Sequence, residues 1–301
     1  MIVSGSGRSG TTWLAEVLSS APYHTLVNEP LKNSNSSRVN DIGFTGWGQH
    51  IPDEADWLEA FELFHDLFSG QELNPNYYTS GSPNFKTKLW VHKMIRIPFL
   101  LPWLLNNFST LKPIYLVRNP YAVISSQLRH RGFGKNKMFK KGVHTVVPQF
   151  EHHDQFYRKW SDDFECLENY TEKLALHWAL ENEHVLLHPW CHQKCIVITY
   201  EDLTLHPFAV FEKIESEIDI NLDFINEDAL KKNSYSKIDS IPENMGQQLN
   251  KWKDHLTSQQ IHSIRNILRK RNFDIYNFET GFLDQEKLSE LRSSAKSYSP
   301  L

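Results

Sequence analysis

The stretch Ile-Val-Ser-Gly-Ser-Gly-Arg-Ser-Gly-Thr-Thr-Trp-Leu, residues 2–14, decides the fold of this chain. A short apolar run leads into three glycines within six residues, and a segment with helical apolar spacing follows them. This order predicts a strand, a glycine-rich turn and a helix over residues 11–20. Glycines let backbone N–H groups approach an anion closely, and the positive end of the helix adds to the attraction. The stretch therefore predicts a phosphate-binding loop.

The loop differs from that of nucleotide triphosphatases in the position of its cation. Gly5 and Gly10 have the spacing of the G-x-x-x-x-G-K-[ST] motif, but Thr11 stands where that motif has the lysine that reaches the β- and γ-phosphates. A cation is present earlier in the loop instead, at Arg8. The loop is therefore expected to bind a phosphate group without the chemistry of ATP or GTP hydrolysis.

Residues 8–14, Arg-Ser-Gly-Thr-Thr-Trp-Leu, resemble the 5′-phosphosulfate-binding motif of sulfotransferases that use 3′-phosphoadenosine 5′-phosphosulfate (PAPS). Arg8 stands where the cytosolic version, P-K-S-G-T-T-W, has its lysine, which implies that Arg8 stabilises the leaving oxygen. The resemblance also implies that Trp13 packs near the adenine. The residues implied to hold the 5′-phosphate and the sulfonate are Arg8, Ser9, Gly10, Thr11 and Thr12.

A second motif, Arg118-Asn119-Pro120 followed by Ser126, comes directly after a buried apolar run. Its spacing resembles the R-x-P…S element of the sulfotransferase 3′-phosphate site. Proline suits the first turn of a helix, and Arg118 can hold a phosphate through a charge-assisted pair to which Ser126 adds a hydroxyl. ATP and GTP lack a 3′-phosphate, so these residues would explain the choice of nucleotide.

Two later segments extend the resemblance. Residues 200–203, Tyr-Glu-Asp-Leu, resemble the Y-E-D-L segment of sulfotransferases, which implies that Tyr200 lies near the adenine. Trp252 and Lys253 resemble the late W-K segment, whose preceding loop closes over the 3′-phosphate. The R-K-G triplet of the cytosolic enzymes is absent, since residues 245–247 read Met-Gly-Gln, and Lys251 and Lys253 are the two candidates to replace it.

Two side chains are candidates for the general base that takes the acceptor proton. Residues 28–30, Asn-Glu-Pro, follow an expected strand and resemble the E-P element of carbohydrate-type and bacterial sulfotransferases, which points to Glu29. His92 lies near, but not at, the position of the histidine used by cytosolic phenol and steroid sulfotransferases, where this chain has Arg96. We favour Glu29 over His92 as the base, with Lys93 assisting at the transferring sulfonate.

Two insertions interrupt the alternation of strands and helices. Residues 31–85 are interpreted as a lid over the acceptor, and the aromatic face of a helix expected at 53–68 either lines an acceptor pocket or packs in the core. The aromatic candidates for that pocket are Trp47, Trp57, Tyr77 and Tyr78. Residues 129–160 are rich in Lys, Arg and Gly, and indicate a flexible solvated loop or a loop that closes on an anionic acceptor.

Composition excludes several other classes of protein. A net charge of −4 over 301 residues gives no reason to expect nucleic acid or an anionic membrane as a partner. No apolar run is long enough to span a bilayer, no secretory signal is evident, and only three cysteines occur, so a cytoplasmic location is expected. The cluster of His188, Cys191, His192 and Cys195 has no common metal-site spacing, so no metal is expected.

The expected fold is α/β: one three-layer domain over residues 1–280, with a central parallel sheet of the P-loop kinase-like type, helices on both faces and a polar tail at 281–301. The resemblance implies transfer of the sulfuryl group of PAPS to a hydroxyl, less readily an amine, of a small-molecule or carbohydrate acceptor, leaving 3′,5′-adenosine bisphosphate (PAP). A P-loop nucleotide or small-molecule kinase is the enzymatic alternative. A non-catalytic adenine-nucleotide-binding protein is the other alternative, and the sequence predicts no oligomeric state.

Overall fold

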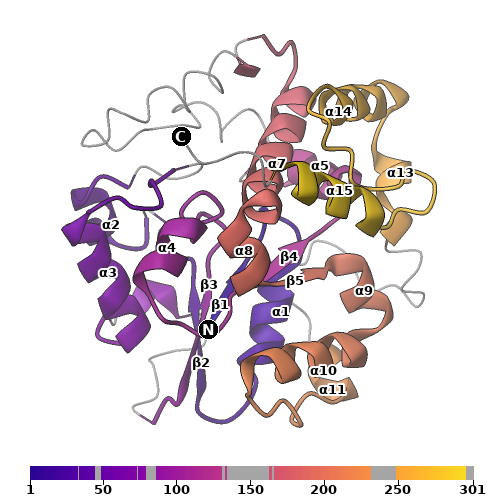
Figure 1. Ribbon diagram of the computed structural model, residues 1–301. Coiled ribbons are helices and arrows are strands. Elements are labelled where there is room, and N and C mark those ends of the chain that lie inside the picture. The colour runs from indigo at the N-terminus through magenta and orange to yellow at the C-terminus, as the bar shows by residue number, and fades with distance from the viewer. Residues whose placement is uncertain are drawn as a thin grey trace.

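Five strands form a parallel sheet in the order β2-β3-β1-β4-β5 (Figure 1). The strands are β1 (Ile2–Ser4), β2 (His24–Asn28), β3 (Leu89–Lys93), β4 (Ile114–Val117) and β5 (Ile196–Thr199). The computed structural model describes residues 1–32, 34–44, 49–72, 74–78, 86–130, 133, 163–164, 166–231 and 249–295. The predicted α/β class and the parallel sheet are confirmed.

The strand order places the segments that follow β1 and β4 at the same end of the sheet, beside each other. β1 pairs with β3 on one side and with β4 on the other, so the chain leaves β1 and β4 at neighbouring positions. In doubly wound sheets, ligands bind outside the carboxyl ends of the strands where the strand order changes direction. The loop after β1 and the turn after β4 both lie at that point.

Helices cover both faces of the sheet. Successive strand residues point to opposite faces, so Val3 joins the core under α1, α9 and α10, whereas Ile2 joins the core under α3, α4, α5 and α7. The helices are α1 (Thr11–Leu18), α2 (Ser37–Asp41), α3 (Leu58–Ser69), α4 (Leu101–Asn107), α5 (Pro120–Arg129), α7 (Tyr170–Leu187), α8 (Pro189–Lys194), α9 (Tyr200–Leu205), α10 (Pro207–Ile218), α11 (Glu227–Lys231), α13 (Trp252–His255), α14 (Ser258–Lys270) and α15 (Gln285–Ala295), with a 3₁₀ turn, η1 (Pro75–Tyr77).

The aromatic face of α3 belongs to the core. Phe64 is fully buried against Trp103, and Trp57 stacks near Phe44 at a ring-centroid distance of 5.1 Å. Tyr77 is also fully buried. Of the two interpretations of the aromatic stripe, core packing is the one that the structure shows for these residues, and Trp47 lies outside the described residues.

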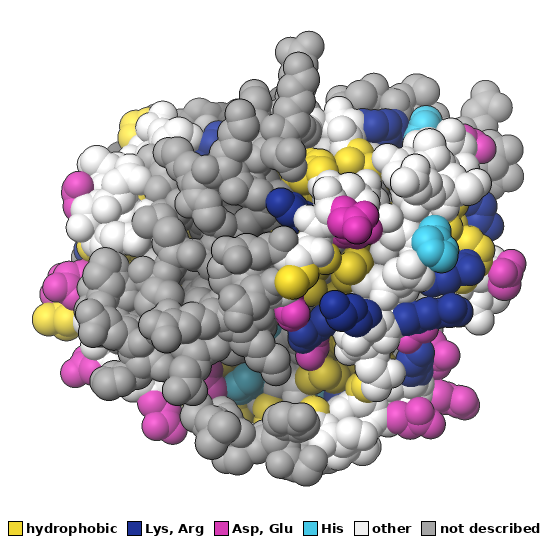
Figure 2. All heavy atoms as spheres, turned by 90° about the horizontal axis from the view of Figure 1, so that it is seen from above, with side chains coloured by type: hydrophobic (Ala, Val, Ile, Leu, Met, Phe, Trp, Pro, Cys, Tyr) yellow, Lys and Arg dark blue, Asp and Glu magenta, His cyan; other side chains and the backbone are white. Residues whose placement is uncertain are grey.

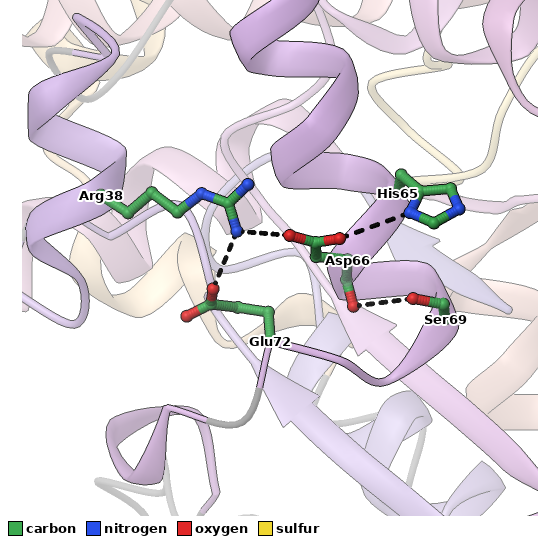
Figure 3. Close-up of polar contacts among 5 residues, drawn as sticks. All are labelled: Arg38, His65, Asp66, Ser69 and Glu72. Carbon is green, nitrogen blue, oxygen red and sulfur yellow. Dashed lines mark hydrogen bonds and ion pairs between the residues drawn. The ribbon is translucent and has the colours of Figure 1, made fainter.

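An ion-pair cluster holds the two helices of the insertion together (Figure 3). The Arg38 guanidinium on α2 lies 2.7 Å from the Asp66 carboxylate on α3 and 3.2 Å from the Glu72 carboxylate beyond it. Asp66 also contacts the His65 ring at 3.4 Å. The pairs are partly exposed, so we assign them a role in orienting α2 more than in stability.

One expected boundary is wrong. The segment expected as a polar tail contains α15, whose Leu288 is buried and whose Arg292 donates from Nε to the Leu186 carbonyl at 2.8 Å. The tail therefore packs on the end of α7. Most of the basic segment 129–160 lies outside the described residues.

None of the helices that the structure describes combines the length and the hydropathy needed to cross a bilayer.

Candidate active site

Two glycines of the loop after β1 are required by close approaches of neighbouring atoms. Gly5 has a φ of 151°, and a Cβ at this position would lie 2.3 Å from the Leu116 carbonyl oxygen of β4. Gly10 has a φ of 104°, and a Cβ there would lie 2.6 Å from the Tyr200 ring. Left-handed backbone at Gly10 and the tight contacts at both positions exclude larger residues. The loop therefore passes directly over β4 and beside Tyr200.

Amide side chains from two helices hold the loop from below. The Ser9 N–H donates to the Ser6 carbonyl at 3.0 Å, which closes the turn. Gln127 on α5 donates from Nε2 to the Gly7 carbonyl at 2.8 Å, and Asn182 on α7 donates from Nδ2 to Ser6 Oγ at 3.0 Å. Sequence analysis missed Gln127 and Asn182. The available signal was an amide among the apolar residues on one face of a helix, because a buried amide needs a partner.

The loop presents hydrogen-bond donors to an anion. No side chain caps α1, because its N-cap is Gly10, so the first N–H groups of the helix (at Thr11 and Thr12) face the loop without a side-chain acceptor. The Ser9 hydroxyl is buried and has no partner among the described residues. Uncapped helix amides and a hydroxyl beside them form an anion-binding arrangement.

Two arginines bring the first and second motifs together. Arg8 donates from Nε to Ser126 Oγ at 3.1 Å, and Arg118 donates from Nη1 to the Arg8 carbonyl at 3.2 Å. The Arg118 guanidinium lies 3.8 Å from the centre of the Tyr200 ring. Burial lowers the pKa of Arg8, and the charges of Arg118 and Arg129 lower it further. These charges repel one another, so a bound polyanion would relieve the repulsion.

Basic side chains also gather on the surface above the sheet. Figure 2, the view from above, shows Lys and Arg side chains in a row on the right-hand part of this face, with hydrophobic side chains beside them. The chain carries a net charge of −4, so this positive region is local.

A carboxylate with two cations ends the neighbouring strands β2 and β3. Glu29 adopts a φ of 53°, and its Oε1 lies 2.7 Å from Lys93 Nζ and accepts from the Ile95 N–H at 3.1 Å. Its Oε2 accepts from Arg96. Burial alone would raise the pKa of Glu29, but the charges of Lys93 and Arg96 outweigh it and hold the pKa below its usual value. Glu29 is therefore ionised at neutral pH, and both oxygens are held in place.

His92, the other candidate base, points away from this cluster. Its ring contacts α3: the Leu67 carbonyl accepts from Nε2 at 2.9 Å, and the Phe68 ring packs edge-on at 5.2 Å. The side chain is 1% exposed, and burial lowers its pKa to about 3. His92 is therefore buried in the core and neutral at pH 7.

The chain matches the family model described as "Sulfotransferase family" over residues 1–223. The chain belongs to the sulfotransferase family. This membership favours the sulfotransferase interpretation over the kinase and the non-catalytic alternatives. A comparison with curated proteins found no relative.

Three solved structures are similar to this sulfotransferase. The sulfotransferase domain from the curacin biosynthetic pathway is 17% identical, with 91% of this chain and 97% of that chain covered and a TM-score of 0.49. The sulfotransferase domain from the Synechococcus PCC 7002 olefin synthase is 16% identical, with coverages of 100% and 94% and a TM-score of 0.42. Mouse sulfotransferase SULT7A1 complexed with PAP is 13% identical, with coverages of 99% and 88% and a TM-score of 0.37.

The remaining predicted cofactor residues of this sulfotransferase lie on two helices, Trp13 on α1 and Trp252 and Lys253 on α13. Trp13 is half-buried on α1 and packs against the core under that helix. Trp252 is buried, stacks on Tyr121 at 4.9 Å and carries Lys253 over its face at 5.5 Å. Because Tyr121 lies in the first turn of α5, Trp252 supports the helix that follows Arg118.

A search for metal ligands gives no candidate in the described part of this sulfotransferase. No group of three or more His, Cys, Asp or Glu side chains among those residues is arranged to hold an ion. Cys191 and Cys195, which belonged to the cluster considered in the sequence, are buried free thiols.

A buried carboxyl lies beneath the loop. Glu181 on α7 is 1% exposed, and its carboxyl contacts the Ser6 hydroxyl and the His177 ring, the latter at 3.5 Å. The Tyr115 hydroxyl donates to the backbone carbonyl of Glu181. Burial raises the pKa of Glu181 to about 8. At that pKa the carboxyl is neutral at pH 7, so the contact with His177 is a polar contact and not a true ion pair.

We expect Glu181 to make the protein less stable as the pH rises. The folded state keeps the proton that the unfolded state releases above its ordinary pKa of 4.5, so stability falls as the pH rises from there towards about 8. The slope is roughly 1.4 kcal/mol per pH unit. Denaturant unfolding of wild type and Glu181→Gln at several pH values across that window checks this. A wild-type curve as flat as that of Glu181→Gln would contradict it.

Proposed function

We propose that this sulfotransferase moves the sulfuryl group of PAPS to a hydroxyl, less readily an amine, of a small-molecule or carbohydrate acceptor, with Glu29 as the general base. One observation carries the proposal. Glu29, the Arg8 loop and Arg118 follow β2, β1 and β4, and Lys93 is the last residue of β3; these four strands are successive neighbours in the sheet. The proposed general base Glu29, the cation Lys93 and the two proposed phosphate-binding elements therefore lie next to one another at the carboxyl end of the sheet.

The residues of the loop fit a 3′,5′-phosphorylated nucleotide. The uncapped start of α1, the buried Ser9 hydroxyl and Arg8 would hold the 5′-phosphosulfate. Arg118 and Ser126 would hold the 3′-phosphate, and Tyr200 would lie beside the adenine. Arg118 supports this role because its Nε is buried without a partner among the described residues. PAPS, when bound, supplies an activated sulfuryl group attached to the 5′-phosphate.

The chain's own residues would carry the proton and the charge. Glu29 would take the proton of the acceptor hydroxyl as the acceptor oxygen bonds to sulfur, and Arg8 would stabilise the negative charge left on the phosphate oxygen. The lowered pKa of Glu29 weakens it as a base while Lys93 is paired with it. We infer that Lys93 turns from Glu29 towards the sulfonate, which restores basicity to Glu29 at the moment it is needed.

Nucleotide binding tests the proposal. We expect PAP to bind wild type tightly, and 5′-AMP and ATP to bind far more weakly. Arg118→Ala should weaken PAP binding by about tenfold to a hundredfold, the range for losing hydrogen bonds to a charged group, and leave 5′-AMP unchanged. Titration calorimetry measures all three ligands. Arg38→Ala is the control, since the ion pairs of Arg38 in the described part of the chain are with Asp66 and Glu72 of the insertion.

Indifference of the wild-type protein to the 3′-phosphate, or a preference for ATP with Mg²⁺, would discard PAPS as the donor.

A further inference from the structure

The backbone around Arg118 is held from two directions. The Trp178 indole on α7 donates from Nε1 to the Arg118 carbonyl at 3.2 Å. The next peptide N–H, that of Asn119, donates to Oε1 of Glu201 at 3.0 Å. The Asn119 side chain also caps α5 by accepting from the Tyr121 N–H at 3.0 Å. The turn that presents Arg118 is therefore fixed by side chains from other helices.

Residues 276–283, a segment near the end of the chain, complete this support. Tyr276 donates from its hydroxyl to Oε2 of Glu201 at 3.1 Å, and the Gly281 carbonyl accepts from Asn119 Nδ2 at 3.1 Å. Tyr276 and Glu201 are both buried. The segment lies beyond residue 223, where the family match ends.

The segment is itself well ordered by short-range contacts. Tyr276 and Leu283 form an isolated antiparallel bridge, and the Asn277 side chain accepts from the N–H groups of Glu279 and Thr280 at 2.9 and 3.0 Å. The Tyr276 ring packs on Trp178 at a centroid distance of 6.1 Å. The segment thus contacts both groups that hold the Arg118 backbone.

Both oxygens of Glu201 bind groups other than the Arg118 guanidinium, although the Arg118 charge acts on Glu201 and partly offsets the rise that burial gives to the pKa of Glu201. A buried carboxylate needs partners, and both oxygens of Glu201 have them, in the Asn119 N–H and the Tyr276 hydroxyl. Among the described residues no ion pair joins Arg118 to a carboxylate. The guanidinium rests on the Tyr200 ring, where its charge is available to an anionic ligand.

We propose that Glu201 and Tyr276 are positioning residues that fix Arg118 for selection of the nucleotide 3′-phosphate. The inference rests on the proposed function, because it takes the donor to be 3′-phosphorylated. Its measurable consequence is discrimination between nucleotides: the ratio of the 5′-AMP and PAP dissociation constants depends on Tyr276, which is not among the residues proposed to hold the nucleotide.

The test compares that ratio in single variants by calorimetry. Tyr276→Phe removes one hydroxyl and should weaken PAP binding about tenfold, while 5′-AMP binding stays within about twofold. Glu201→Ala should lower the ratio at least as far, and Glu201→Gln should restore most of it, since its amide can serve both partners. Lys287→Met is the matched control, because it breaks a contact to Asp274 in the same region without a link to Arg118.

A double-mutant cycle separates positioning from general stability. If Tyr276 acts through Arg118, then Tyr276→Phe should change PAP binding no further once Arg118→Ala is present. Additive losses, or a lowered melting temperature with an unchanged ratio, would overturn the positioning role. A wild-type protein that binds PAP and 5′-AMP equally would instead refute the proposed function, so the two failures are distinguishable.

Discussion

We expect Glu29→Gln to lower kcat by at least about a hundredfold, which is the lower end of the range for removal of a general base. PAP binding should stay within a few fold of wild type. The amide has nearly the shape of the carboxylate, so the Ile95 N–H keeps an acceptor. It cannot take the acceptor proton. Initial rates with PAPS and an acceptor, together with PAP calorimetry, separate the loss of chemistry from the loss of binding.

The substitution also removes the charge partner of Lys93 and Arg96, which are both largely buried. Thermal unfolding of Glu29→Gln must therefore accompany the kinetics, because two largely buried cations lose the negative charge of Glu29, which destabilises the folded state. His92→Gln is the matched control, since glutamine can still donate to the Leu67 carbonyl. We expect its kcat to stay within a few fold of wild type. The reverse pattern, a large loss in His92→Gln and near-normal turnover in Glu29→Gln, would transfer the role of base to His92.

Much of the site could be predicted because its residues are local to strand ends. The glycines of the loop and the proline after Arg118 are short-range signals of a strand, a turn and a helix. The contact between Glu29 and Lys93 also follows from the pattern, once β2 and β3 are taken as parallel neighbours whose carboxyl ends meet.

The supports of the site could not be predicted, because they join distant segments. Asn182 lies 176 residues from its partner Ser6, and Tyr276 lies 75 residues from Glu201. A buried amide or carboxylate in a sequence indicates that some partner exists, but it does not identify the partner. The aromatic face of α3 poses the same problem. Helical spacing shows that one face is apolar, and only the tertiary structure shows that this face meets the core and not a ligand.

Arg8→Met is expected to lower kcat by about a hundredfold to a thousandfold, the effect of losing one group that stabilises charge developing in the transition state. Arg8 has a φ of 78°, and the strain of this positive φ is about the same for arginine and methionine because neither side chain is branched at Cβ. The substitution therefore removes the charge and the hydrogen bond to Ser126 with little added backbone strain. Arg8→Lys should keep much of the activity, because the resembling motif of the cytosolic enzymes has lysine here.

A control must distinguish the specific role of Arg8 from the effect of the positive charges around it. Arg129 contributes to the same field, since its charge helps to lower the pKa of Arg8, but it is exposed and its Nε is directed to the Ser125 carbonyl at 3.4 Å. Arg129→Met should therefore cost activity only modestly, and high salt should diminish that cost by screening. If Arg129→Met and Arg8→Met lowered kcat equally, the positive field as a whole would account for the effect, and Arg8 would have no particular place at the leaving oxygen.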